Sequence, residues 1–142
     1  MMISEEFKTI VDDLSKKGKM DFFEGATEDQ ISQFEKDHHL SLPDKYKEWL
    51  SFSDGGEWFL PAGVQLYGVA HKPIIDVDED DRPNDNYIVI GALSTGDPIL
   101  CEKTGERISI YNHEAGKIES DETYEDFLCF IKDLPGILGI GG

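Results

Sequence analysis

The spacing of apolar residues changes once along this chain, at the pair Gly55-Gly56. Before the pair, apolar residues recur at intervals of three and four, as they do along one face of an amphipathic helix. After the pair, short runs rich in β-branched and aromatic residues alternate with turn sequences such as "STGD", "KTGE" and "HEAG", which is typical of an antiparallel sheet. The change therefore predicts helices first and a sheet second.

Three helices are expected before Gly55. Ser4 is placed to cap the first helix, and Thr27 with Gln30 forms a capping-box pattern at the start of the second. Pro43 suits the first position of the third helix, where its missing N–H has no cost. The predicted core positions of the three helices are Phe7, Ile10, Val11 and Leu14, then Ile31 and Phe34, then Tyr46, Trp49 and Leu50.

The second half of the chain predicts strands within residues 63–70, 86–93, 97–103, 107–113 and 116–120. A last helix is expected to follow, capped by Ser120 or Thr123, with Tyr124, Phe127, Leu128 and Ile131 on one stripe. Because helices lie at both ends of the strand-rich part, the fold class is α+β, with N-terminal helices and a C-terminal helix packed on a mainly antiparallel sheet. A length of 142 residues is typical of one domain, so a single domain over 1–142 is expected.

The chain is strongly acidic: 30 Asp and Glu face 13 Lys and Arg, for a net charge of -17. Nucleic-acid binding needs a basic surface to contact phosphates, so direct nucleic-acid binding is not expected. Anionic membranes would be repelled for the same reason, and no run of apolar residues is long enough to span a bilayer. An acidic field steers basic partner proteins, although acidity also has the simpler effect of keeping a protein soluble.

The acidic segment, residues 76–86 ("DVDEDDRPNDN"), is the one low-complexity stretch, and an exposed loop is predicted there. Its first residues resemble a calcium-binding EF loop, but the sixth position is Asp81 rather than Gly and the twelfth is Tyr87 rather than Glu. No metal or cofactor is therefore predicted. A solvated loop and a contact surface for a basic partner are the two interpretations, and the second assigns partner binding to Asp76, Asp78, Glu79, Asp80, Asp81 and Asp85.

Patterns of known catalytic sites are missing from the sequence. There is no G-x-S-x-G, no G-x-G-x-x-G, no phosphate-binding P-loop and no HExxH among the four histidines. Cys101 and Cys129 lie within apolar patterns, where a thiol behaves as a small hydrophobic side chain. The start of the chain does not read as a signal peptide, so a cytoplasmic protein with two reduced thiols is expected, and we predict that it is not an enzyme.

The segment "TEDQISQFEKDHHLSLPDKYKEWLSFSDGGEW" resembles the N-terminal part of the SUKH superfamily. The resemblance rests on Ile31 and Glu35, a Leu42-Pro43 pair, Tyr46, and Gly55-Gly56 followed by Trp58. Later stretches, "YIVIGALSTGDPILCEK", "IYNHEAGKIE" and "TYEDFLCFI", are similar to the strands and final helix of that superfamily. The resemblance covers roughly residues 27–133 and departs from the superfamily in the acidic segment.

The resemblance implies an α+β fold and a protein that works by binding other proteins. Many bacterial members resemble immunity proteins that neutralise a cognate toxin, often a nuclease, while fungal relatives regulate cell-wall synthesis. A cognate, basic toxin is thus the expected partner of a monomer; a regulatory or scaffold domain of the same fold is the alternative. Trp58 and Phe59 are candidate apolar anchors for that partner, although core burial is the competing interpretation, above all for Trp58.

Overall fold

The computed structural model describes residues 4–16, 19–60, 63–70, 74–75, 85–93, 96–112 and 114–134, without the side chains of residues 59, 60 and 119–122. In these residues the chain forms four helices and seven strands. In chain order they are α1 (Glu5–Ser15), β1 (Lys19–Asp21), α2 (Glu28–His38), α3 (Asp44–Phe52), β2 (Gly56–Leu60), β3 (Val64–Leu66), β4 (Tyr87–Leu93), β5 (Pro98–Glu102), β6 (Ile108–Asn112), β7 (Lys117–Tyr124) and α4 (Phe127–Lys132).

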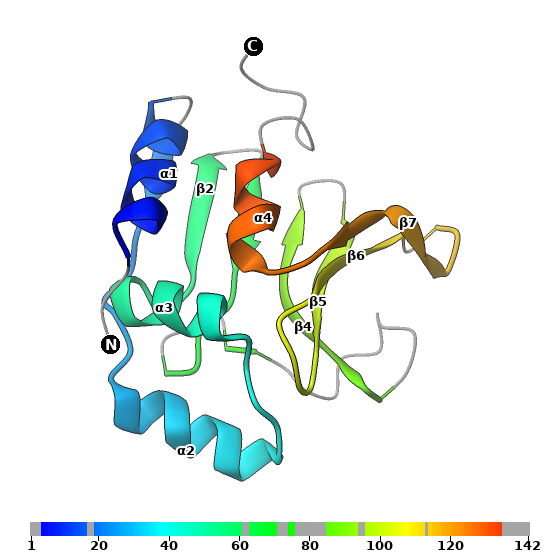
Figure 1. Ribbon diagram of the computed structural model, residues 1–142, viewed down its shortest axis with the longest axis horizontal. Helices are drawn as coiled ribbons and strands as arrows, with labels where there is room; N and C mark the ends of the chain where they lie inside the picture. Colours follow the sequence, from blue (N-terminus) through cyan, green and yellow to red (C-terminus); the bar gives the residue numbers. More distant parts are fainter. Residues whose placement is uncertain are drawn as a thin grey trace.

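The described strands form one sheet in which every strand pairs with its neighbours in sequence, in the order β1-β2-β3-β4-β5-β6-β7. All six pairings are antiparallel. Helices α1, α3 and α4 lie on one side of the sheet, and α2 packs at the end below α3 (Figure 1). The expected α+β fold, with N-terminal helices and a C-terminal helix on an antiparallel sheet, is confirmed.

The core lies between the sheet and the helices and is rich in aromatic rings. Phe7 of α1 stacks on Trp49 of α3 with ring centroids 6.1 Å apart, and Trp49 meets Trp58 of β2 edge-on at 4.9 Å. Phe127 of α4 packs against Tyr46 at 4.8 Å. All five side chains are fully buried, so each helix on this face is attached to the sheet through at least one ring.

The helix starts follow the capping rules. Ser4 Oγ accepts a hydrogen bond from the N–H of Phe7, and Thr27 and Gln30 form the complete capping box. Pro43 was expected to be the first residue of the third helix, but α3 begins one residue later, at Asp44, and Pro43 precedes it. Because Pro43 has no side chain that can cap, Glu106 takes this role from the β5–β6 turn: its carboxylate accepts the N–H groups of Asp44 at 2.8 Å and Lys45 at 3.3 Å.

Two parts of the expected layout are wrong. The stretch after the first helix forms β1, and the residues directly after Gly55 form β2, so the sheet begins before the change in apolar spacing. At the other end β7 continues to Tyr124, so Ser120 and Thr123 belong to a strand and do not cap a helix. Asp126 caps α4 instead, since its Oδ1 accepts the N–H of Cys129 at 2.8 Å. None of the helices in the described ranges is long and apolar enough to cross a membrane.

Candidate partner-binding surface

The turn between α3 and β2 holds a buried carboxylate. Asp54 is fully buried, and its two carboxylate oxygens accept the backbone N–H groups of Val69 and Ala70, each at 2.7 Å. Gly68 lies so close that a Cβ atom there would stand 2.5 Å from the Asp54 carbonyl oxygen, so only glycine fits. Asp54 therefore fixes the chain just after β3, where it turns toward the acidic segment.

The acidic segment starts and ends at well-held positions. On its N-terminal side, Ile75 is buried and donates its N–H to the Gly68 carbonyl at 2.9 Å. On its C-terminal side, the Asn86 carbonyl accepts the N–H of Lys103 at 2.8 Å, immediately before β4. Residues 76–84 thus connect two points fixed by the sheet, although they lie outside the described residues.

The predicted partner-binding residues other than Trp58 fall into three groups. Asp76, Asp78, Glu79, Asp80 and Asp81 lie outside the described residues. Asp85 is exposed in the turn before β4, consistent with a surface role. Phe59 lies on β2, but its side chain is outside the description.

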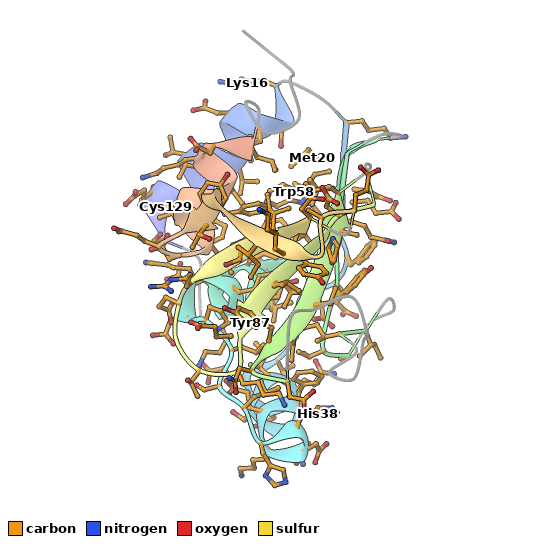
Figure 2. The ribbon with its side chains drawn as sticks, turned by 90° about the vertical axis from the view of Figure 1, so that its right-hand side faces the viewer. Lys16, Met20, His38, Trp58, Tyr87 and Cys129 are labelled. Atoms are coloured by element: carbon orange, nitrogen blue, oxygen red, sulfur yellow. The ribbon has the colours of Figure 1, made fainter. Side chains whose placement is uncertain are left out.

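Trp58 is not a surface anchor, because its side chain is fully buried between the sheet and the helices (Figure 2). It packs on Trp49 and Phe127, so the competing interpretation, core burial, is the one that the structure supports. Its indole N–H has no hydrogen-bond partner among the described residues. Removing the ring would open a cavity in the core, so a Trp58 variant would not report on binding alone.

Sequence reasoning missed the exposed apolar side chains. Among the described residues, the large ones are Phe22 at 38% exposure, Phe52 at 42% and Ile74 at 43%. Ile74 stands next to the start of the acidic segment. A signal for Phe52 was present, since it is six residues after Tyr46 and so falls about 120° away from the Tyr46–Trp49–Leu50 stripe of α3.

The titratable side chains in the described part of the chain include a buried thiol and a buried phenol. No group of three or more His, Cys, Asp or Glu is arranged to hold a metal ion there. Burial raises the pKa of the Cys101 thiol far above its usual range, which keeps the nucleophilic thiolate scarce at neutral pH. Burial also raises the pKa of the Tyr46 phenol, whose hydroxyl donates to the Tyr67 carbonyl. Both Cys101 and Tyr46 pack in the hydrophobic core.

The fold and surface define an α+β domain with three helices on one sheet face and an acidic connection between β3 and β4. Within that class, the chain belongs to the SMI1 / KNR4 family (SUKH-1), whose model matches residues 25–133. The match includes α2 to α4 and all strands except β1. No curated protein matches the chain.

Proposed function

We propose that this chain is an immunity protein that binds and neutralises a cognate bacterial toxin, a basic protein of the nuclease type. The observation that carries the proposal is a net charge of -17 on a member of the SUKH-1 family. A nuclease needs a basic surface to hold phosphates. An acidic protein that covers this surface competes with the nucleic acid for the same groups, so binding alone is sufficient for inhibition.

Some of the described carboxylates have structural roles and are not assigned to the partner. Asp54, Glu106 and Asp126 hold backbone N–H groups, and Glu35 accepts the N–H of Leu42 at 2.7 Å. The six carboxylates of the acidic segment are assigned to partner contact: Asp76, Asp78, Glu79, Asp80, Asp81 and Asp85. Phe59 is the apolar residue retained in this assignment, since apolar anchors dominate interface energetics.

The electrostatic part of this mechanism acts on the rate of association. A basic toxin approaching an acidic surface is steered, and association can exceed the neutral rate of about 10⁵–10⁶ M⁻¹ s⁻¹ by one hundredfold or more at low salt. Fast capture is useful because a nuclease damages the cell until it is bound. The proposal places the complex in the cytoplasm and requires no catalytic step and no cofactor.

A protection assay tests the proposal. The probe is the C-terminal domain of a large protein encoded beside this gene, expressed from an inducible promoter in a host with and without this chain. We expect growth arrest without the chain and normal growth with it, together with a stable complex on gel filtration. A matched control co-expresses the chain with a toxic domain from an unrelated neighbourhood, which must remain toxic.

Two outcomes would contradict the proposal. If the chain neither protects cells nor binds the neighbouring domain, the alternative of a regulatory or scaffold domain gains. If a complex forms but the chain carrying all six acidic-segment carboxylates as Asn or Gln associates at the wild-type rate, the electrostatic mechanism is wrong even though the immunity function stands.

A further inference from the structure

Two exposed phenylalanines touch each other at one corner of the molecule. Phe22, directly after β1, and Phe52, the last residue of α3, meet edge-on with ring centroids 5.4 Å apart. Both rings also contact Trp49, at 5.6 and 5.4 Å, and Trp49 is fully buried. The aromatic pair, Phe22 and Phe52, is therefore exposed on one side and held by the core on the other, so little side-chain freedom is left to lose on binding.

The aromatic pair adjoins an open edge of the sheet. β1 lies at the end of the strand order, pairs only with β2 in the described part of the chain, and precedes Phe22 without a break. Met20 of β1 packs toward the core on the helix-bearing side of the sheet, and the Phe22 ring reaches Trp49 on the same side. Figure 1 shows α1 over this edge and β7 at the opposite one.

The other face of the same edge carries two carboxylates opposite each other. Asp21 of β1 is in register with Glu57 of β2, a cross-strand arrangement in which like charges are destabilising. Neither carboxylate forms an ion pair within the described residues; the Glu57 Oε1 atom has only the Gln65 amide nitrogen at 3.5 Å. Lys19 lies two residues before Asp21, and its positive charge would repel a cationic side chain. The position beside Asp21 is therefore the one on this edge that suits a cation.

We propose that the aromatic pair and the β1 edge form a docking surface for an extended segment of a basic partner protein. The segment adds to the sheet beside β1. Its side chains then alternate between the two faces: apolar side chains meet Met20 and Phe22, and one Arg or Lys meets Asp21 and Glu57. This surface is separate from the acidic segment. It rests on the proposed function only in taking the partner to be basic.

Charge favours this occupant over a second copy of the chain. A second copy would bring another net charge of -17, whereas a basic segment relieves the repulsion between Asp21 and Glu57. An open strand edge without a partner is also a site of unwanted self-association, which Lys19 and the short length of β1 oppose.

Titration with short peptides, followed by amide resonances of the isotope-labelled protein, tests the docking surface. The probes are acetyl-Val-Arg-Val-Thr-Val-amide and its matched control with Glu in place of Arg. We expect the Arg peptide to bind in about the millimolar range and to shift the amides of residues 19–22 and 52. The Glu peptide should bind at least about fivefold more weakly.

Matched variants separate this surface from the acidic segment. Phe52→Ser should weaken Arg-peptide binding about fivefold or more, while Ile74→Ser, which removes an equally exposed apolar side chain elsewhere, should not. Asp21→Lys should abolish the preference for Arg over Glu, and Glu114→Lys, with the same charge change on the β6–β7 turn, should preserve it. Denaturant unfolding of each variant distinguishes lost contacts from lost folding.

The docking surface is wrong if the Arg peptide shifts only residues around 74–87, if neither peptide binds, or if gel filtration with light scattering shows a dimer that Phe52→Ser dissociates. These outcomes are independent of the protection assay. If the chain protects cells but the peptide test fails, the docking surface is wrong and the immunity function stands. If the peptide binds but the chain does not protect cells, the docking surface stands and the immunity function is wrong.

Discussion

At the scale of single residues, several carboxylates have structural roles as partners of backbone N–H groups. Asp54 is the most buried of them and joins the α3–β2 turn to the chain after β3. The two N–H groups replace water as hydrogen-bond donors to the buried carboxylate, so both of its oxygens have a partner in the interior. The unusual acidity of the chain therefore does not translate directly into partner contacts.

Asp54→Ala should destabilise the protein, because it leaves the N–H groups of Val69 and Ala70 without their acceptor. We expect a loss of about 1–3 kcal/mol in the free energy of unfolding, measured in urea. Glu114→Ala, which changes an exposed carboxylate, is the control and should have almost no effect. Equal stability of the two variants would contradict the role assigned to Asp54.

The two thiols should differ in reactivity. Burial raises the pKa of both thiols, but more strongly that of Cys101, which is fully buried, whereas Cys129 on α4 is partly exposed. In the folded protein, iodoacetamide should modify Cys129 at least about tenfold faster than Cys101, as followed by mass spectrometry of peptides. In urea the two rates should converge. Preferential labelling of Cys101 in the folded protein would contradict its burial on β5.

At the scale of elements, sequence rules worked where the determinants are local. Ser4, Thr27 and Gln30 identified two helix starts because a cap involves residues three positions apart. Sequence rules failed for β1, β2 and the length of β7, because "KMD" and "GEWFL" have no distinctive periodicity and become strands by pairing with their neighbours in the sheet. The last helix was placed too early for the same reason: the alternation of β7 is weak, and Thr123 can serve in a strand or as a cap.

The N-terminus of α3 depends on a residue about sixty positions away. Glu106→Ala should lower the free energy of unfolding by about 0.5–2 kcal/mol, because the N–H groups of Asp44 and Lys45 lose their acceptor. Pro43 provides no side-chain cap that could replace it. Glu106→Gln, which keeps an acceptor oxygen but loses the charge near the helix dipole, should cost less. Thermal unfolding measures both. A larger loss for Gln than for Ala would show that Glu106 does not act as a cap.

At the scale of the whole molecule, composition indicated a strongly acidic chain and the family resemblance indicated a binding role, but only the three-dimensional arrangement separated candidate surface residues from core residues. Trp58 is the clearest example. Its position after Gly-Gly was compatible with an anchor or with the core, and only its contact with Trp49 decides for the core. Phe22 and Phe52 show the converse, because their exposure depends on how α3 meets β1.

Salt should stabilise this protein. A net charge of -17 on 142 residues gives the compact state a self-repulsion that dissolved ions screen. Raising NaCl from about 20 mM to about 300 mM should therefore raise the unfolding temperature by a few degrees, equivalent to about 1 kcal/mol. A fall in the unfolding temperature would mean that local ion pairs such as Glu6–Lys132 outweigh the net repulsion.

The fixed ends of the acidic segment have an evolutionary consequence. The backbone hydrogen bonds of Ile75 and Asn86 are made with residues outside the acidic segment, so we expect insertions and substitutions between them to leave the sheet in place. Doubling the length of a loop adds only about 0.6 kcal/mol of closure entropy. Under the proposed function, a change of toxin could therefore be met by changes in this segment alone, and a laboratory library randomised between Ile75 and Asn86 would test that freedom.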